Sequence, residues 1–149
     1  MEQLSLGLTN KQEGERLFEE IYVPIRSEWA FAKGKANGGS AGSDGISVED
    51  LEENLSDNLA KLQAELQSRS YQPQPVRRVS IPKPNGGERH LGIANVRDRV
   101  VQQSILMAME PFFEPEFSES SYGFRRGRSQ IGAIEAAQKH VADGKEWVV

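Results

Sequence analysis

The chain has 149 residues, a length that suits one domain with its own hydrophobic core. Hydrophobic residues make up 37% of it and charged residues 27%, the net charge is −4, and cysteine is absent. No apolar run approaches the ~20 residues of a membrane helix, no signal-peptide pattern opens the chain, and no disulfide or thiolate metal site can form. We therefore expect a cytoplasmic protein without a membrane partner.

The charge is distributed unevenly. Acids outnumber bases in residues 1–75, whereas bases outnumber acids in residues 76–149. The bases are densest over residues 76–99, where six cations outnumber two acids, Glu88 and Asp98. The cations are Arg77, Arg78, Lys83, Arg89, Arg97 and Arg99. A local basic patch attracts phosphates even on an acidic protein, so the net charge does not exclude a nucleic-acid partner.

Residues 1–46 contain one helical pattern and one glycine-rich segment. Residues 1–10 have no periodicity, and apolar residues then recur every four positions, which predicts a helical segment over residues 12–32. Its apolar stripe comprises Leu17, Ile21, Ile25 and Trp29. Pro24 predicts either two short helices or one kinked helix. Residues 33–46 are rich in glycine and poor in apolar residues, so we expect a mobile loop; no Lys-Ser/Thr follows, which excludes a P-loop.

A second helix is predicted from Ser47 to Ser68. Ser47 and Asp50 have the spacing of a capping box with a shorter acid. Leucines then follow helical spacing and predict a buried face: Leu51, Leu55, Leu59, Leu62 and Leu66. Residues 71–75 contain two prolines and predict an extended connection.

The segment from Val76 to Gln103 predicts a β-hairpin followed by a helix. The turn falls at residues 84–87, and alternation places Lys83 on the face of Val79 and Ile81. On the returning strand, Arg89 shares a face with Leu91 and Ile93. If the two apolar faces pair as one buried surface, the side chains of both cations extend from the hairpin tip on the same side. There they can bind a polyphosphate together. The alternative is a solvated turn with ordinary surface cations.

The helix after the hairpin is predicted to begin with Asn95 as N-cap and Asp98 as capping acid, and to end before Pro115. Arg97 and Arg99 lie in its first turn, where cations oppose the helix dipole. A bound phosphate or carboxylate compensates such cations. The alternative is an internal ion pair with Asp98 or Glu110.

Residues 114–128 are irregular, and Ser129 is predicted to cap a last helix that ends near Asp143. In the irregular segment we expect Phe124 to be a core residue and Arg125 and Arg128 to contact phosphate. Residues 146–149 are β-branched and aromatic and predict the start of a strand, so we expect the natural sequence to continue. From the sequence, neither a Ser-His-Asp arrangement nor a metal-ligand cluster can be assembled.

Several of these motifs together resemble the N-terminal fingers of group II intron-type reverse transcriptases. They occur in the family's order and spacing: residues 81–86 (IPKPNG), Arg89, residues 91–93 (LGI), residues 96–103 (VRDRVVQQ) and residues 121–129 (SYGFRRGRS). Asp44 and the residues after it resemble the family's fingers loop. The likeness covers roughly residues 41–149, and His90, Ala94 and Arg126 depart from the family's prolines.

The resemblance implies roles for the matching residues. Lys83 and Arg89 are expected to hold the triphosphate of an incoming dNTP. Contacts to the template or other nucleic acid are expected from Gly42, Asp44, Gly45, Arg97, Arg99, Gln102, Arg125 and Arg128. In the family the aspartates that bind Mg²⁺ follow the strand that residues 146–149 resemble. We therefore expect Mg²⁺ and catalytic residues in a longer parent protein, and no polymerisation by this chain alone.

We predict a helix-rich α+β fold in which one antiparallel hairpin packs across two or three helices. Residues 1–40 form an N-terminal extension with a kinked helix, and residues 41–149 form the fingers. The predicted function is the fingers region of an RNA-directed DNA polymerase and maturase, with dNTP, template RNA and intron RNA as partners. The alternatives are a stand-alone, non-catalytic RNA-binding module and a structural piece that forms a homodimer in isolation.

Overall fold

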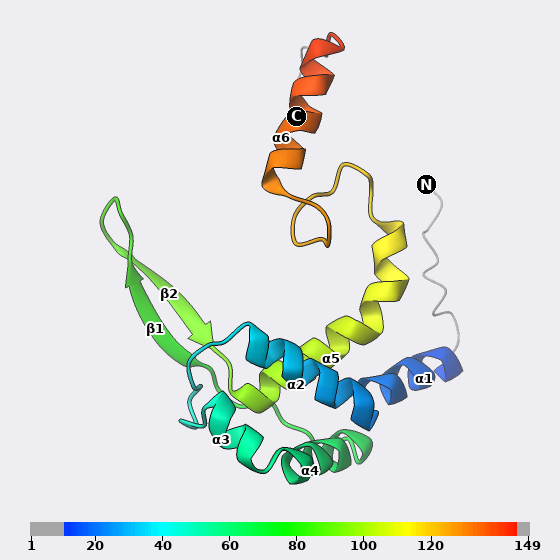
Figure 1. The fold of residues 1–149 in the computed structure, drawn as a ribbon, viewed down its shortest axis with the longest axis vertical. Coiled ribbons are helices and arrows are strands. Elements are labelled where there is room, and N and C mark those ends of the chain that lie inside the picture. The colour runs from blue at the N-terminus through cyan, green and yellow to red at the C-terminus, as the bar shows by residue number, and fades with distance from the viewer. Residues whose placement is uncertain (1–10, 146–149) are drawn as a thin grey trace. The chain divides into compact units, whose positions relative to one another are not determined.

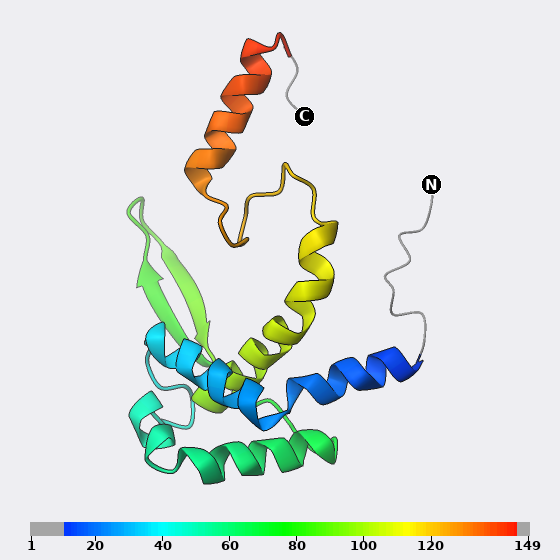
Figure 2. The same ribbon diagram turned by 45° about the vertical axis from the view of Figure 1, so that its right-hand side comes forward.

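The structure, a computed structural model, describes residues 11–145, which fall into two compact units. The first unit, up to Met109, contains α1 (Lys11–Ile21), α2 (Pro24–Ala36), α3 (Val48–Glu53), α4 (Leu55–Gln67), β1 (Arg77–Pro82), β2 (Glu88–Ile93) and most of α5 (Val96–Phe113). The second unit contains the end of α5, the 3-10 helix η1 (Glu114–Glu116) and α6 (Gln130–Ala142). Figures 1 and 2 show the helix-rich α+β fold that the sequence predicts.

The first helical segment forms two helices, one of the two outcomes predicted for Pro24. α1 ends at Ile21, and Pro24 opens α2 at a position where its missing N–H is not needed. The predicted apolar stripe is wrong at Trp29, whose side chain is 62% exposed, while Ala30 and Phe31 are buried. The stripe assumed one continuous helix axis, and the break between α1 and α2 changes which residues of α2 face the core.

The segment after Ser47 also forms two helices, although one was predicted. The capping box is confirmed: the Asp50 amide donates to Ser47 Oγ at 3.1 Å, and the Ser47 amide donates to Asp50 Oδ2 at 2.8 Å. The helix breaks at Asn54, whose φ of −127° and ψ of 43° are not helical. Asn58 Nδ2 donates to the Leu51 carbonyl at 2.9 Å and satisfies an acceptor near the break.

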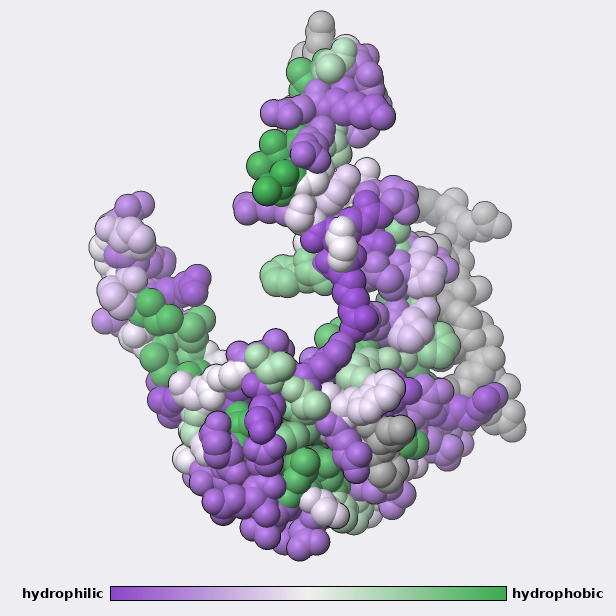
Figure 3. Space-filling model, viewed as in Figure 1, coloured by the Kyte–Doolittle hydropathy of each residue, from purple (hydrophilic) through white to green (hydrophobic). Residues whose placement is uncertain are grey.

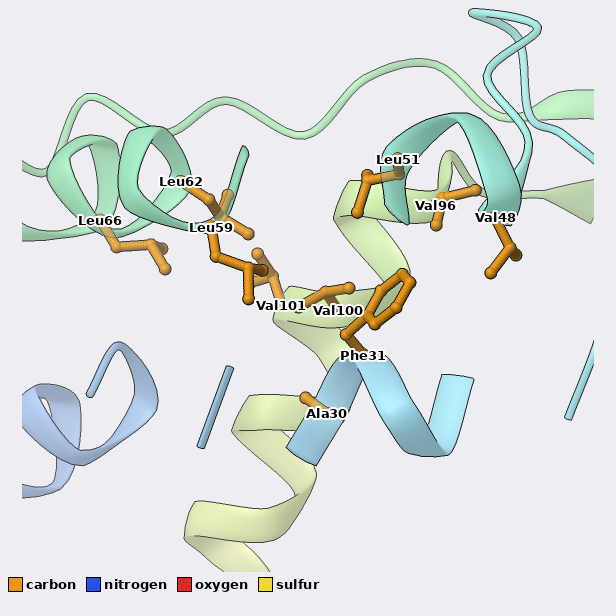
Figure 4. Close-up of a cluster of buried hydrophobic side chains, with 10 residues drawn as sticks. All are labelled: Ala30, Phe31, Val48, Leu51, Leu59, Leu62, Leu66, Val96, Val100 and Val101. Carbon is orange, nitrogen blue, oxygen red and sulfur yellow. The ribbon is translucent and has the colours of Figure 1, made fainter. Parts of the chain in front are cut away.

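Four helices, α2 to α5, build the hydrophobic core of the first unit (Figure 4). Its buried side chains are Ala30, Phe31, Val48, Leu51, Leu59, Leu62, Leu66, Val96, Val100 and Val101. Most of the leucines predicted from helical spacing are buried here, because α3 and α4 both turn their apolar faces toward α5. The strands contribute no buried residue to this core.

β1 and β2 pair as an antiparallel hairpin that extends away from the helices (Figures 1 and 2). Val79 lies opposite Leu91, so their side chains share one face. Val79 is half-buried, whereas Ile81 and Leu91 are exposed, and Figure 3 shows hydrophobic side chains on the surface of the hairpin. The prediction that the hairpin packs across two or three helices is therefore wrong. Alternation defines which residues share a face of a hairpin, but it does not define what covers that face.

α5 begins after Asn95, whose carbonyl accepts the Arg99 amide at 3.0 Å, as predicted for the N-cap position. The prediction for Asp98 is wrong. Asp98 is only 3% exposed, and its carboxylate accepts from the Tyr71 hydroxyl at 2.6 Å and from the Gln74 amide at 3.0 Å. It fastens the extended connection over residues 71–75 to α5 instead of capping the helix.

In the second unit, Ser129 caps α6 as predicted, because its Oγ accepts the Gly132 amide at 3.0 Å. The prediction that Phe124 is a core residue is wrong: its side chain is fully exposed, and its φ of 57° is unusual for a residue with a side chain. The strand predicted over residues 146–149 lies outside the described residues.

Candidate nucleotide and nucleic-acid interface

The tip of the hairpin carries two exposed cations. The register places Arg89 opposite Ile81, which confirms that Arg89 shares the face of Val79 and Leu91. Lys83 lies at the turn, where its amide donates to the Gly87 carbonyl at 3.0 Å. Gly86 and Gly87 have φ values of 84° and 83°, which glycine adopts without strain. Within residues 11–145 the structure gives neither cation an ion-pair partner, and dNTP binding by the pair stays a prediction.

Arg99 contacts the glycine loop, by which we mean residues 38–46. Its Nη2 donates to the Ser40 carbonyl at 2.9 Å, and its Nη1 lies 3.5 Å from the Gly38 carbonyl. Arg77, at the start of β1, donates from Nε to the Ala41 carbonyl at 3.0 Å. The loop was expected to be mobile because it can bury little apolar surface of its own. Arginines from other elements bind its carbonyls, and the mobility itself stays a prediction. Residues 33–36, which were expected to belong to the loop, are instead the end of α2.

Ser43 and Asn95 hold the centre of the glycine loop. The Ser43 amide donates to Asn95 Oδ1 at 2.7 Å, and Ser43 Oγ donates to the Pro75 carbonyl at 2.6 Å. Asn95 itself is 1% exposed. Further along the loop, Asp44 Oδ1 accepts the Ile46 amide at 3.1 Å and closes a tight turn. Three residues of this loop were predicted to contact nucleic acid. Gly42 is buried, whereas Asp44 and Gly45 are exposed.

Arg97 has an internal partner that was not among those predicted. It forms an ion pair with Glu65 of α4, and its guanidinium lies over the Tyr71 ring at 5.5 Å. The hydrogen bond from Arg97 to Glu65 raises the pKa of Arg97. Burial, followed by the hydrogen bond to Asp98, raises the pKa of Tyr71. Arg97 therefore fastens α4 to α5, whereas Gln102, further along α5, is exposed.

A groove of about 530 Å³ lies between α3, α4 and the start of α5, and no pattern in the sequence predicted it. Its charged lining residues are Asp44, Asp50, Asp57, Glu65, Lys61 and Arg97. Carboxylates outnumber cations, so the groove does not favour phosphates as the hairpin tip does. Grooves between helices depend on packing angles that no local sequence pattern gives.

In the second unit, Arg125 is bound by its own loop. Its side chain is 8% exposed and pairs with Glu114 at 2.9 Å. Its Nη1 donates to the carbonyls of Ser118 at 2.8 Å and Ser121 at 3.0 Å, and its guanidinium lies over the Phe117 ring. These contacts fix the shape of the irregular segment over residues 114–125.

The other arginines of this segment are also paired. Arg128 forms an ion pair with Glu119, donates to the Glu119 carbonyl at 2.8 Å, and lies over the Tyr122 ring. The hydrogen bond from Arg128 lowers the pKa of the Glu119 carboxylate. Arg126, which is exposed, pairs with Glu110 at 3.1 Å. A phosphate bound here has to compete with these carboxylates, and the predicted phosphate contacts of Arg125 and Arg128 stay predictions.

Residues 11–145 contain neither a metal-ligand cluster nor a membrane-spanning helix. No group of three His, Asp or Glu side chains in this range is arranged to hold a metal ion. No helix in the same range is long and apolar enough to cross a membrane.

The fold and the surface define a helix-rich α+β module whose exposed hairpin presents cations at its tip. No protein-family model matches the chain. The group II intron-encoded protein LtrA of Lactococcus lactis is 32% identical over 136 residues, which are 90% of this chain and 22% of LtrA. Protein YkfC of Escherichia coli is 46% identical over 112 residues, which are 72% of this chain and 29% of YkfC.

A third relative is nuclear intron maturase 1 of Arabidopsis thaliana mitochondria, which is 46% identical over 51 residues, 34% of this chain and 7% of the maturase. LtrA is thus a group II intron-encoded protein and the plant relative is an intron maturase, as the sequence motifs indicated. The chain spans less than a third of the length of each of these relatives.

Proposed function

We propose that this chain is the fingers region of an RNA-directed DNA polymerase of the group II intron type. In this proposal Lys83 and Arg89 hold the triphosphate of the incoming dNTP. The observation that carries it is the contrast among the cations. The arginines Arg97, Arg99, Arg125 and Arg128 each bind a carbonyl or a carboxylate of this chain, whereas Lys83 and Arg89 stand exposed on one hairpin without an ion-pair partner within residues 11–145.

RNA is the proposed second ligand. Two relatives, LtrA and nuclear intron maturase 1, are an intron-encoded protein and an intron maturase, which supports intron RNA as a partner. We propose that the exposed part of the glycine loop at Asp44 and Gly45 contacts the template strand, together with Gln102 on α5. Arg125 and Arg128 contribute in this proposal only where a phosphate displaces their carboxylate partners.

The described residues do not fit a Mg²⁺ site, so no step of phosphoryl transfer is assigned to them. Polymerases use carboxylate-bound Mg²⁺ ions to position and stabilise the attacking and leaving oxygens. We propose that a longer parent protein supplies these carboxylates and that the 149-residue chain adds no nucleotide to a primed RNA template. Incorporation of dNTP by this chain alone would contradict the proposal.

Alanine substitutions at the hairpin tip test the dNTP role in the parent enzyme. Lys83→Ala or Arg89→Ala should raise the KM for dNTP by about tenfold or more, because each removes a charge-assisted hydrogen bond to phosphate. Arg78→Ala is the matched control, since Arg78 lies exposed on β1, on the opposite face of the same hairpin. A normal KM for dNTP combined with weaker RNA binding would assign the two cations to RNA instead.

A non-catalytic RNA-binding module is the second candidate. The glycine loop favours it, because contacts within this chain hold the loop in place and no further domain is needed to position it. The two candidates differ in the natural reading frame. A frame that continues beyond Val149 into an aspartate-bearing strand supports the polymerase, whereas a stop codon there supports the module.

We also propose that the isolated chain self-associates through α6. Ile131, Ile134 and Val141 of this helix are all exposed, and α6 contributes no buried residue within the described part of the second unit. Such a row of apolar side chains on one helix is a common interaction surface.

A further inference from the structure

The glycine loop is bonded to both ends of the hairpin. On the side where the chain enters the hairpin, the Pro75 carbonyl accepts from Ser43 and Arg77 donates to the Ala41 carbonyl. On the side where the chain leaves it, Asn95 accepts the Ser43 amide and Arg99 binds the carbonyls of Gly38 and Ser40. Segments more than 30 residues apart in the sequence thus meet at the base of the hairpin.

The contact between the loop and Asn95 is very close. A Cβ atom at Gly42 would lie 2.0 Å from Asn95 Oδ1 and 2.6 Å from Asn95 Cα. Because one of these atoms belongs to the backbone, the clash cannot be relieved by rotating a side chain. Gly42 is therefore required by the close approach of the loop to the start of α5, and any larger residue there must displace the loop.

The geometry of Arg99 differs from that of a residue free to bind phosphate. Two of its nitrogens point at loop carbonyls, and its Nε is buried without a hydrogen-bond partner among the described residues. A planar guanidinium can reach two carbonyls at once, whereas the ammonium group of lysine is a compact point charge. A lysine at position 99 would thus keep the charge and lose the paired contact.

We propose that Arg99 and Asn95 are positioning residues that fix the glycine loop to the base of the hairpin. The loop and the hairpin base then behave as one element, and Arg99 promotes RNA binding through the position of the loop instead of through its own charge. The part of this proposal that concerns RNA rests on the proposed function.

Hydrogen exchange of the full 149-residue chain tests the positioning role without any RNA. In Arg99→Lys, amides of residues 38–46 should exchange at least about fivefold faster, the factor that the loss of one hydrogen bond produces. Arg78→Lys should leave them unchanged, because Arg78 is exposed and forms no side-chain hydrogen bond or ion pair with the loop within residues 11–145. Unchanged exchange in Arg99→Lys would overturn the proposal.

Gly42→Ala provides a second, independent variant, with Gly34→Ala as its control because a Cβ at Gly34 meets nothing within 4 Å. Gly42→Ala should raise the exchange of the same loop amides and of the amides at the hairpin base, residues 76–78 and 93–95. Faster exchange in the loop alone would show that the loop and the hairpin are not coupled.

Binding of a single-stranded RNA oligonucleotide then separates positioning from direct contact. If Arg99 acts through the loop, Arg99→Lys and Arg99→Gln weaken RNA binding by the same factor. Both variants then keep the salt dependence of binding that the unsubstituted 149-residue chain shows. If Arg99 contacts phosphate, Arg99→Lys retains binding and Arg99→Gln lowers the salt slope by about one. If the unsubstituted 149-residue chain binds no RNA, the proposed RNA role is wrong. The hydrogen-exchange experiment alone then decides whether Arg99 positions the loop.

Discussion

At the scale of single residues, the arginines show why a cation in a sequence does not identify its ligand. A guanidinium donates to phosphate, carboxylate and backbone carbonyl with similar geometry. Arg125 lies in a motif that suggests phosphate binding, yet it pairs with Glu114 and donates to two backbone carbonyls. Glu114 is eleven residues away, and no periodic pattern connects the two positions.

Removing Arg125 should therefore destabilise the second unit. In Arg125→Ala the carbonyls of Ser118 and Ser121 lose a charged donor, and Glu114 loses its ion pair. We expect a loss of about 2 kcal/mol in the free energy of local opening of residues 114–129, measured by hydrogen exchange. Arg126→Ala is the control and should cost less than about 0.5 kcal/mol, because that ion pair is exposed. Equal effects in the two variants would contradict the structural role of Arg125.

Tyr71 predicts a pH dependence in the first unit. Burial and the hydrogen bond to Asp98 raise the pKa of Tyr71, so the folded state favours the neutral phenol. This contribution to stability is complete below the unfolded pKa of about 10 and is lost as the pH rises toward the folded pKa. Tyr71→Phe should cost about 1 kcal/mol at pH 8, measured by urea unfolding.

The difference in unfolding free energy between the unsubstituted chain and Tyr71→Phe should then shrink above pH 10. Only the unsubstituted chain has the phenol and loses its contribution. Comparing the two proteins at each pH removes the effect of the lysines, which titrate in the same range in both. A difference that stays constant up to pH 11 would show that the hydroxyl contributes nothing to this pH dependence.

At the scale of elements, local signals were most reliable at helix starts. Ser47 and Asp50 form the predicted capping box, and Ser129 caps α6, because these contacts involve residues only three positions apart. The hairpin pairing was also predictable, since a tight glycine turn and alternating apolar residues together define a register. The break at Asn54 and the burial of Asp98 were not predictable, because both depend on partners in other elements.

The cap at Ser47 gives a prediction for α3. Ser47→Ala removes the acceptor of the Asp50 amide and should lower the free energy of unfolding by about 1 kcal/mol, measured by urea denaturation of the whole chain. Ser56→Ala is the matched control, since Ser56 is exposed near the start of α4. If both variants are equally stable, the capping box does not stabilise the first unit.

At the scale of the whole molecule, the two units differ in how much apolar surface they bury. The first has a core built from four helices, whereas Ile131, Ile134 and Val141 of α6 in the second are exposed. Figure 3 shows hydrophobic side chains on the surface of this helix. A helix of 13 residues that buries little apolar surface gains little from packing. Covering this surface is the physical reason to expect self-association.

Sedimentation tests the self-association of the isolated chain. The parent should form dimers or larger species at micromolar concentration, and the double variant Ile131→Glu/Ile134→Glu should shift the population to monomer. Glu135→Gln, a change beside the apolar row on the same helix, should leave the association state unchanged. A parent chain that is monomeric at the highest concentrations would rule out α6 as a self-association surface.

The sequence was sufficient for the helix-rich α+β class, the antiparallel hairpin with the residues that share its apolar face, the capped helix starts and the relationship to group II intron-encoded proteins. These features depend on periodicity, on residues a few positions apart and on motifs in a fixed order. The tertiary structure alone decided which cations remain exposed, how Asn95 and Arg99 hold the glycine loop, and that the hairpin stands away from the core. Each of these depends on contacts between residues far apart in the chain, which local patterns do not specify.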